Sequence, residues 1–339
     1  MIMHAEVHLR KAIVMKNVFD VILLTALPAS GKSEIRNFMA HMEPKDLQSN
    51  FHIGQSLQLD DFPYVVFMQK IDMELDKLGL EHFCSLPNGG TFIDVRTYGV
   101  LSQMLSEDYH DLKNRVIVKT DRPAEYMFNR IDRARQLAGM EPVLSMYPSD
   151  IRAKLIEAMN PEAEKDIAEK NSQYPDSFDN KTIIIECARG GKQGSEMPLT
   201  GSTGYQYYFK NLAPDLLSNA AVLYVQVTPE ESRRKNAARF DPNDPDSSLF
   251  HSTPEKVMLN DYGCDDMQYL LEHTEVKDTV TVKNYGRTWH VPAGVIDNRS
   301  DMTSFLRADA KEWKKQDIDT ITNALKATVD TMWKNYNKD

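Results

Sequence analysis

The residues most suited to chemistry in this sequence lie in the segment ALPASGKSEI, residues 26–35. Gly31, Lys32 and Ser33 match the second half of the phosphate-binding consensus G-x-x-x-x-G-K-[S/T]. A glycine lets the backbone approach an anion closely, a lysine adds a mobile positive charge, and a serine hydroxyl can ligate Mg²⁺. Ala26 stands at the first glycine of the consensus, which is tolerable if its φ angle is negative. The segment therefore predicts a loop that cradles phosphate.

Carboxylates at the predicted ends of two strands form the second group. Asp60 and Asp61 end the segment SLQLDD, and Glu186 ends the apolar run TIIIE. A carboxylate at a strand end beside a phosphate loop can accept a proton from a hydroxyl group or hold Mg²⁺ through water. An Asx turn that simply ends the strand is the structural alternative for Asp60.

Arginines in two predicted helices form the third group. The segment PEESRRKNAAR, residues 229–239, follows an apolar strand and contains Arg233 and Arg239. Arginine is always charged and offers a planar fork of donors to phosphate oxygens, so this helix could contact a transferring phosphoryl group. A solvated basic helix with an acidic first turn is the alternative. Arg130 and Arg133, one helical turn apart, could grip an anion or form salt bridges with neighbouring acidic residues.

A loop ending in GKS, combined with a strand ending in LDDF, resembles the P-loop kinases of small molecules. The closest branch is that of the uridine, pantothenate and glycerate kinases. The resemblance covers residues 18–62 well and 181–300 loosely. It implies ATP and Mg²⁺ as cofactors, and a nucleotide and a small-molecule acceptor as binding partners. It also implies a catalytic base at Asp60, a metal-side carboxylate at Asp61, a Walker B carboxylate at Glu186 (where aspartate is usual), and a lid helix after the fourth core strand.

Site residues follow from the motif and from this resemblance. The predicted catalytic residues are Lys32, Asp60, Arg233 and Arg239. The predicted nucleotide-binding residues are Pro28, Ala29, Ser30, Gly31, Lys32, Ser33 and Ile35 in the loop and first turn, with Asn298 and Arg299 beside the adenine ring. The predicted metal ligands are Ser33, Asp61 and Glu186.

These residues must be positioned by strands that alternate with helices. Apolar runs at residues 18–25, 181–191, 220–229 and 291–298 predict buried strands, and a further strand is expected in the segment FHIGQSLQLDDF, ending at Asp60 and Asp61. The alternation predicts an α/β fold with a doubly wound, mostly parallel sheet whose ligands bind at the carboxyl ends of the strands. A hairpin is expected around KNYGRTW, and residues 301–339 are expected to be helical.

The predicted organisation is a single domain over residues 1–339. A helix-rich insertion is expected at about 97–180, covering one side of the site, and a lid-like segment at about 230–262. No internal repeat is evident. The three cysteines form no C-x-x-C pair, and the sequence shows neither a membrane-spanning run nor a signal peptide. These features predict a cytoplasmic protein with reduced thiols.

Three functions are compatible with a phosphate loop: transfer of the γ-phosphoryl group of ATP to a small molecule, hydrolysis of a nucleotide, and action on a nucleotide or nucleic acid, as in a polynucleotide kinase. The net charge of −10 disfavours a nucleic-acid substrate, because phosphate contacts need a basic groove. An internal N-K-x-D guanine motif is missing, and so is an apolar strand ending in Asp-Glu. A kinase acting on a hydroxyl group is therefore the leading prediction, with its acceptor and oligomeric state open.

Overall fold

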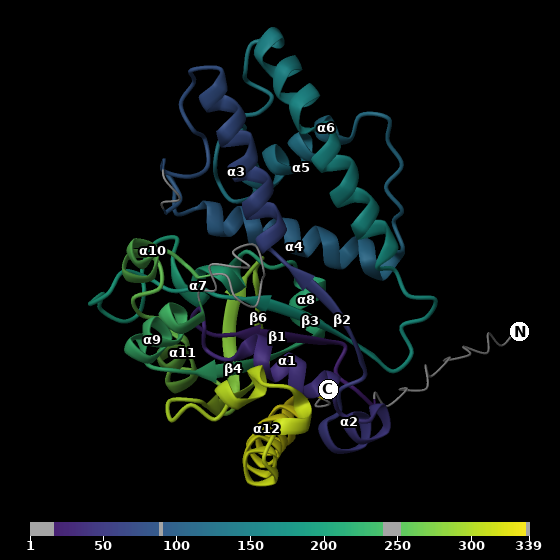
Figure 1. Cartoon of the computed structure of the whole chain (residues 1–339), viewed down its shortest axis with the longest axis vertical. Coiled ribbons are helices and arrows are strands. Elements are labelled where there is room, and N and C mark those ends of the chain that lie inside the picture. Colours follow the sequence, from purple (N-terminus) through teal and green to yellow (C-terminus); the bar gives the residue numbers. More distant parts are fainter. Residues whose placement is uncertain (1–16, 88–90, 240–251, 337–339) are drawn as a thin grey trace, which may run out of the picture.

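A computed structural model of the chain (Figure 1) describes residues 17–87, 91–239 and 252–336. Its centre is a six-stranded sheet in the order β2-β3-β1-β4-β6-β5. The strands are β1 (Val21–Thr25), β2 (Gln55–Asp60), β3 (Lys181–Cys187), β4 (Ala220–Gln226), β5 (Thr279–Asn284) and β6 (Arg287–Asp297). All neighbouring pairs are parallel except β5 and β6. The predicted α/β class with a mostly parallel sheet is confirmed.

The antiparallel strand arises from the hairpin expected around KNYGRTW. Tyr285 and Gly286 connect β5 to β6 with φ angles of 50° and 68°. Two successive positive φ angles are typical of the tight turn that matches the twist of a hairpin, and glycine adopts such an angle without strain. β5 therefore forms one edge of the sheet, while β1 lies in its middle between β3 and β4.

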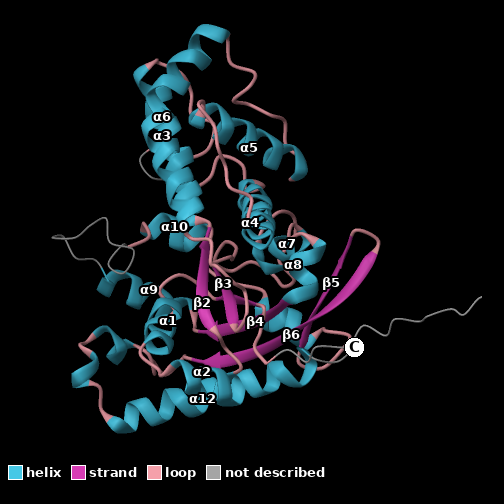
Figure 2. Ribbon diagram, turned by 90° about the vertical axis from the view of Figure 1, so that its right-hand side faces the viewer, coloured by secondary structure: helices cyan, strands magenta, loops and turns pink. Residues whose placement is uncertain are grey.

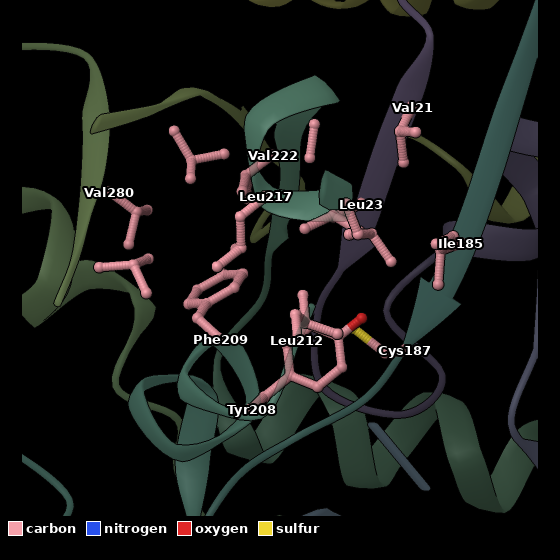
Figure 3. Packing of buried hydrophobic residues seen from close by; sticks show 14 of the residues in the cluster. Val21, Leu23, Ile185, Cys187, Tyr208, Phe209, Leu212, Leu217, Val222 and Val280 are labelled. Carbon is pink, nitrogen blue, oxygen red and sulfur yellow. The ribbon is translucent and has the colours of Figure 1, made fainter. Parts of the chain in front are cut away.

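Helices cover both faces of this sheet. One face packs against α1 (Lys32–Ala40), α2 (Pro44–Phe51) and α12 (Lys315–Tyr336), with Ile22, Leu24 and Ile184 pointing toward them. α12 runs along this face (Figure 2). The other face packs against α4 (Thr97–Asn114), α7 (Gly204–Lys210), α8 (Pro214–Asn219) and α11 (Met267–Glu272). Figure 3 shows its core, where Val21, Leu23 and Ile185 meet Tyr208 and Phe209.

A helical layer stands on the second face of the sheet (Figure 1). It contains α3 (Phe62–Lys77), α4, α5 (Pro123–Leu137) and α6 (Ser149–Ser172), and these helices share their own apolar cluster. α4 joins the two cores, because Leu101 and Met104 belong to the helical cluster while Leu105 and Tyr109 belong to the sheet cluster. The helical insertion expected from the sequence is present, and α3 adds residues from position 62 onward to it.

The absence of an internal repeat, expected from the sequence, is wrong. The ends of α3 and α5 share one local structure at a spacing of 60 residues. Each helix has proline at its start and a glycine after its end, Gly79 or Gly139, with a φ angle of 68° or 75°. In both, the next residue donates its N–H back to the last turn, Leu80 to Leu75 and Met140 to Arg135.

The same repeat includes a buried aspartate in each helix. The carboxylate of Asp72 accepts hydrogen bonds from the backbone N–H groups of Phe83, Cys84 and Ser85. The carboxylate of Asp132 accepts them from Val143, Leu144 and Ser145, at the same offsets. Each aspartate thus fixes the chain that returns after its helix, and the helical layer contains two copies of one motif.

The remaining helices lie near the carboxyl ends of the strands. They are α9 (Pro229–Arg239) and α10 (Glu255–Asn260), followed after β6 by the short 3-10 turns η1 (Ser304–Arg307) and η2 (Ala310–Glu312). The predicted lid-like segment at 230–262 therefore begins in α9 and ends just after α10, and its residues 240–251 lie outside the described part. Within the described ranges, no helix combines the length and apolar character that a bilayer span requires.

Candidate functional site

The predicted phosphate loop lies between the carboxyl end of β1 and the first turn of α1. Ala29 and Gly31 have φ angles of 54° and 104°, so the backbone turns sharply before Lys32 begins the helix. A Cβ atom on Gly31 would lie 2.4 Å from Oγ1 of Thr303, which only glycine avoids. Ala26 is not among the described residues with positive φ, so its methyl group is accommodated. Strand, tight loop and helix start occur in the order that a phosphate cradle needs.

Lys32 is held inside this loop. Its side chain is only 5% exposed, and its ammonium group donates a hydrogen bond to the carbonyl oxygen of Leu27 over 3.1 Å. Ser33, at the second position of α1, lines the adjoining pocket. The structure therefore brings the predicted lysine and hydroxyl to the same opening, at the positive end of a helix dipole.

Asn298 forms hydrogen bonds to the loop on its buried side, away from the pocket. Its side chain is fully buried, and its amide donates hydrogen bonds to the carbonyl oxygen of Ser30 over 2.7 Å and to Thr303 Oγ1 over 2.8 Å. Its carbonyl oxygen accepts the N–H of Met302. Arg299 forms an exposed ion pair with Asp297. The contact of Asn298 and Arg299 with an adenine ring stays a prediction. The side chain of Asn298 already forms hydrogen bonds that hold the loop and the segment after β6 together.

α9 packs directly beside the loop. The hydroxyl of Ser232 donates a hydrogen bond to the carbonyl oxygen of Pro28 over 2.7 Å, and Lys235 forms a buried ion pair with Asp301 at 2.8 Å. Arg233 pairs with Glu230 at 3.1 Å on the same helix. The side chain of Arg239 lies outside the described part of the chain. Contact of these arginines with a phosphoryl group therefore stays a prediction.

A pocket of about 410 Å³ opens beside the loop at the carboxyl ends of β2 and β3. Its walls come from the loop, the ends of these two strands, the helical layer and α10. They include Lys32, Ser33, Arg36, Asp60, Asp61, Phe92, Tyr98, Leu101, Glu186, Arg189, Val257, Asp261 and Tyr262. The volume falls within the range of small-ligand sites, and ligands of doubly wound sheets bind at this edge.

Asp60 and Glu186 are register partners at the ends of β2 and β3, so their side chains share one face of the sheet. Oδ1 of Asp60 also accepts the N–H of Phe62 at 3.0 Å, so the Asx turn considered as an alternative is present. Asp60 is exposed where it borders the open pocket, but the protein packed around its carboxylate reduces its hydration and raises the pKa of Asp60 to about 6, with further contributions from Asp61 and Glu186. A carboxylate with this pKa can exchange a proton near neutral pH.

Glu186 is paired within the site. Its carboxylate lies 2.9 Å from Nε of Arg36 on α1, and Arg36 also binds the side chain of Gln58 on β2. These three side chains link the end of β3 to the first helix and to β2. Glu186 thus lies near the loop, where the sequence placed it, with a cation already beside it.

Asp61 forms an ion pair with an arginine, and its predicted role beside a metal ion stays a prediction. Its carboxylate binds a guanidinium nitrogen of Arg189 at 2.6 Å, and Arg189 is 3% exposed. The Arg189 guanidinium lies between two aromatic rings, 5.2 Å from that of Tyr98 and 4.9 Å from that of Tyr208. Burial opposes the charged form, but the pKa of Arg189 is raised because Asp61, Cys187 and nearby tyrosines outweigh burial. Asp61 serves as the counterion of a buried arginine.

The described residues contain no group of three or more His, Cys, Asp or Glu side chains arranged to hold a metal ion. A hydroxyl at Ser33 and carboxylates at Asp60 and Glu186 nevertheless border one pocket. Oxygen ligands of this kind suit Mg²⁺, which keeps several waters and takes further ligands from substrate phosphates. The donor set fits a Mg²⁺ ion that arrives with a nucleotide.

Two residues at the site were missed by sequence reasoning. The hydroxyl of Tyr205 donates to the carbonyl oxygens of Ala26 at 2.8 Å and Cys187 at 3.3 Å, joining the loop to the end of β3. Asp265 binds the hydroxyl of Tyr224 at 3.1 Å. Burial raises the pKa of Asp265 to about 6, an effect that the positive charge of Lys32 reduces. The second Asp-Asp pair in the sequence, at 265–266, is the signal that could have indicated it.

Arg130 and Arg133 belong to the helical layer and not to the pocket. Arg130 is buried and pairs with Asp108 at 2.8 Å and Glu107 at 3.2 Å, while Arg133 pairs with Glu107 at 2.5 Å. The salt-bridge interpretation is therefore correct for this pair. The partner carboxylates are Glu107 and Asp108 of α4, whereas acidic residues close to the arginines in the sequence were expected.

Comparisons with protein-family models, with curated proteins and with solved structures gave no significant match.

Proposed function

We propose that the protein is an ATP-dependent kinase of the P-loop type that transfers the γ-phosphoryl group to a hydroxyl group of a small molecule. One observation carries this proposal. A loop that presents Gly31, Lys32 and Ser33 at the end of the central strand opens on a pocket that Asp60 also lines. The loop that would cradle phosphate and a carboxylate of raised pKa therefore share one cavity.

The chain's own residues would divide the work as follows. The N–H groups of the loop and the Lys32 ammonium would bind the phosphate oxygens. Ser33 would hold Mg²⁺, with Glu186 beside it through water, and the metal would neutralise charge between the β- and γ-phosphates. Asp60 would orient the acceptor hydroxyl and accept its proton.

The space beyond the loop favours transfer over hydrolysis. The pocket continues from the loop to Tyr98 and Leu101 of α4, to Phe92 in the segment before α4, and to Tyr262 after α10. A site that only activates water needs no such wall, whereas an acceptor must be held in line with the γ-phosphate. The acidic residues on the same wall also disfavour a nucleic acid as the substrate.

A labelled-transfer experiment tests the proposal. The full-length protein is incubated with Mg²⁺ and γ-labelled ATP, alone and with a panel of nucleosides, sugars, amino sugars and sugar acids. We expect one acceptor class to stimulate ADP formation, with label recovered in a product whose mass has increased by one phosphate. Release of free phosphate at the same rate with every acceptor and with none would identify a hydrolase instead.

A further inference from the structure

One part of the pocket is formed away from the loop, by the helical layer and the segments after β2, β3 and α10. We call it the acceptor half and define it as Asp61, Phe92, Tyr98, Arg189, Asp261 and Tyr262, all of which line the pocket. If the loop binds the phosphates of a nucleotide, this half is left for the acceptor. The following inference rests on the proposed function and concerns the charge of that acceptor.

The cations that line the pocket already have partners. Arg189 is paired with Asp61 at 2.6 Å, and Arg36 with Glu186 at 2.9 Å. Lys32 belongs to the phosphate loop, where it contacts the carbonyl oxygen of Leu27. An anionic acceptor would have to break one of the two ion pairs to obtain a cation. The pair of Arg189 and Asp61 is buried, so an acceptor that took Arg189 would leave the Asp61 carboxylate without its counterion, which is unfavourable.

Two carboxylates in the pocket have the opposite character. Asp60 and Asp261 line it, and neither forms an ion pair with another described residue in the structure. Asp261 accepts a hydrogen bond from the hydroxyl of Tyr98 at 3.1 Å, and that hydroxyl also lies 3.3 Å from the hydroxyl of Tyr262. An ionised carboxylate can accept several hydrogen bonds, so Asp261 keeps acceptor capacity for a ligand.

The walls around Asp261 are aromatic. The rings of Phe92 and Tyr98 meet edge to face at 4.9 Å, and Tyr262 lies next to Tyr98 at 6.3 Å. These rings offer an apolar surface beside a hydrogen-bonding carboxylate. The combination suits a small molecule with a carbon frame and several hydroxyl groups.

We infer that the acceptor is an uncharged or cationic compound with several hydroxyl groups, such as a sugar, an amino sugar or a nucleoside. Sugar acids and phosphate esters would place a negative charge beside Asp60 and Asp261. Asp261 is the residue that distinguishes these classes, because it receives a hydroxyl or ammonium group of the acceptor. Tyr98 is a positioning residue that holds the Asp261 carboxylate.

Matched acceptors test this inference. Values of kcat/KM with Mg-ATP at pH 7.5 are compared for glucosamine, glucose and gluconate, and for adenosine and AMP. We expect the uncharged or cationic member of each set to be favoured at least tenfold over the anionic member. Asp261→Asn should reduce this discrimination about tenfold. Asp261→Glu, which keeps the charge, should retain most of it.

The controls separate this inference from the proposed function. Asp319→Asn makes the same charge change at an exposed position of α12, on the opposite face of the sheet, and should leave the discrimination unchanged. The affinity for Mg-ADP is measured by titration for every variant and should not change. The inference would be overturned if gluconate or AMP were the best acceptor. It would also be overturned if a folded Asp261→Asn variant that binds Mg-ADP showed unchanged discrimination. Either result would leave the kinase proposal standing. Failure of the unsubstituted protein to bind Mg-ADP would instead remove the proposed function and this inference with it.

Discussion

The side-chain amide of Asn298 donates a hydrogen bond to the carbonyl oxygen of Ser30 over 2.7 Å, and so joins the end of the last parallel strand to the phosphate loop. The two residues are 268 positions apart. The same amide group reaches Thr303, whose hydroxyl lies where a side chain on Gly31 would be. The shape of the loop is therefore fixed by contacts on its buried side, and its pocket side is left for a ligand.

This relationship predicts the effect of Asn298→Ala. The substitution leaves the carbonyl of Ser30 and the N–H of Met302 without these partners, which should lower the free energy of unfolding by about 1–3 kcal/mol. A less rigid loop should also bind Mg-nucleotide more weakly, by roughly tenfold, which is about 1.4 kcal/mol. Urea denaturation and calorimetric titration measure the two effects. Asn114→Ala, at an exposed position of α4, is the matched control. Nucleotide affinity equal to that of the unsubstituted protein would mean that the loop does not depend on Asn298.

The role of Asp60 is tested by Asp60→Asn. We expect the rate of phosphoryl transfer to fall by roughly 10²–10⁴-fold, as for the loss of a general base, while Mg-ATP affinity changes little. If Asp60 mainly held Mg²⁺, affinity and rate would fall together. Glu186→Gln is the matched control at the neighbouring register position and should affect mainly the dependence on Mg²⁺. Unchanged transfer in Asp60→Asn would favour hydrolysis over transfer to a hydroxyl group.

The raised pKa of Asp60 adds a pH dependence to the same prediction. Because the pKa is about 6 in the folded protein, against 3.8 as the ordinary value, the folded state binds more protons than the unfolded state between these pH values. The contribution of Asp60 to stability therefore falls as the pH rises from about 4 to 6, and Asp60→Asn should raise the melting temperature at pH 7. Transfer by the unsubstituted protein should increase with pH around 6 and then level off. The difference in melting temperature between Asp60→Asn and the unsubstituted protein should therefore become more favourable to the variant from pH 4 to pH 7. A difference that becomes less favourable to the variant would contradict the prediction.

The ion pair between Asp61 and Arg189 is tested by a double-mutant cycle. Arg189→Met and Asp61→Asn each leave one buried charge without its partner, so each should cost about 3–5 kcal/mol in the free energy of unfolding. The double variant should cost clearly less than the sum, with a coupling of roughly 0.5–3 kcal/mol. If Asp61 instead served as a metal ligand, Asp61→Asn would weaken Mg-ATP binding and Arg189→Met would not.

The repeated aspartates of the helical layer predict matched effects. Asp72→Ala and Asp132→Ala each remove the acceptor of three backbone N–H groups, so each should lower the free energy of unfolding by roughly 2–4 kcal/mol. Both residues lie away from the pocket, so Mg-nucleotide affinity should remain within about twofold of the original (about 0.4 kcal/mol). Chemical denaturation of the pair checks this. A large effect for one variant and none for the other would mean that the two copies of the motif differ in structural role.

Local patterns in the sequence predicted the elements that carry the loop. The apolar run ending at Thr25, the glycine at position 31 and the helical spacing after it are neighbours in the chain, so one short segment contains the whole signal. The strand ends at Asp60 and Glu186 were predicted for the same reason. Their direct pairing in register, however, depends on the sheet order, which no local pattern specifies.

Contacts between distant segments could not be predicted. Asp61 and Arg189 are 128 residues apart, and the resemblance to P-loop kinases implied a metal-side role for Asp61 without indicating this ion pair. The repeat was also missed, because its apolar positions exchange one residue for another, as in Leu80 and Met140. Between residues 63–85 and 123–145 few positions stayed the same, and they are Pro63 and Pro123, Ile71 and Ile131, Asp72 and Asp132, Gly79 and Gly139, Glu81 and Glu141, and Ser85 and Ser145.

The central claim is that the loop around Lys32 binds the phosphates of a nucleotide, and calorimetric titration of Mg-ATP tests it most directly. The unsubstituted protein should bind one Mg-ATP per chain. Lys32→Ala should remain folded and lose at least tenfold in affinity, which corresponds to about 1.4 kcal/mol, because in the proposed function the ammonium group binds phosphate oxygens and contributes little to the core. Lys326→Ala, at an exposed position of α12, is the matched control and should bind as the unsubstituted protein does. The claim would be contradicted if folded Lys32→Ala and the unsubstituted protein bound Mg-ATP with equal affinity, or if neither bound it.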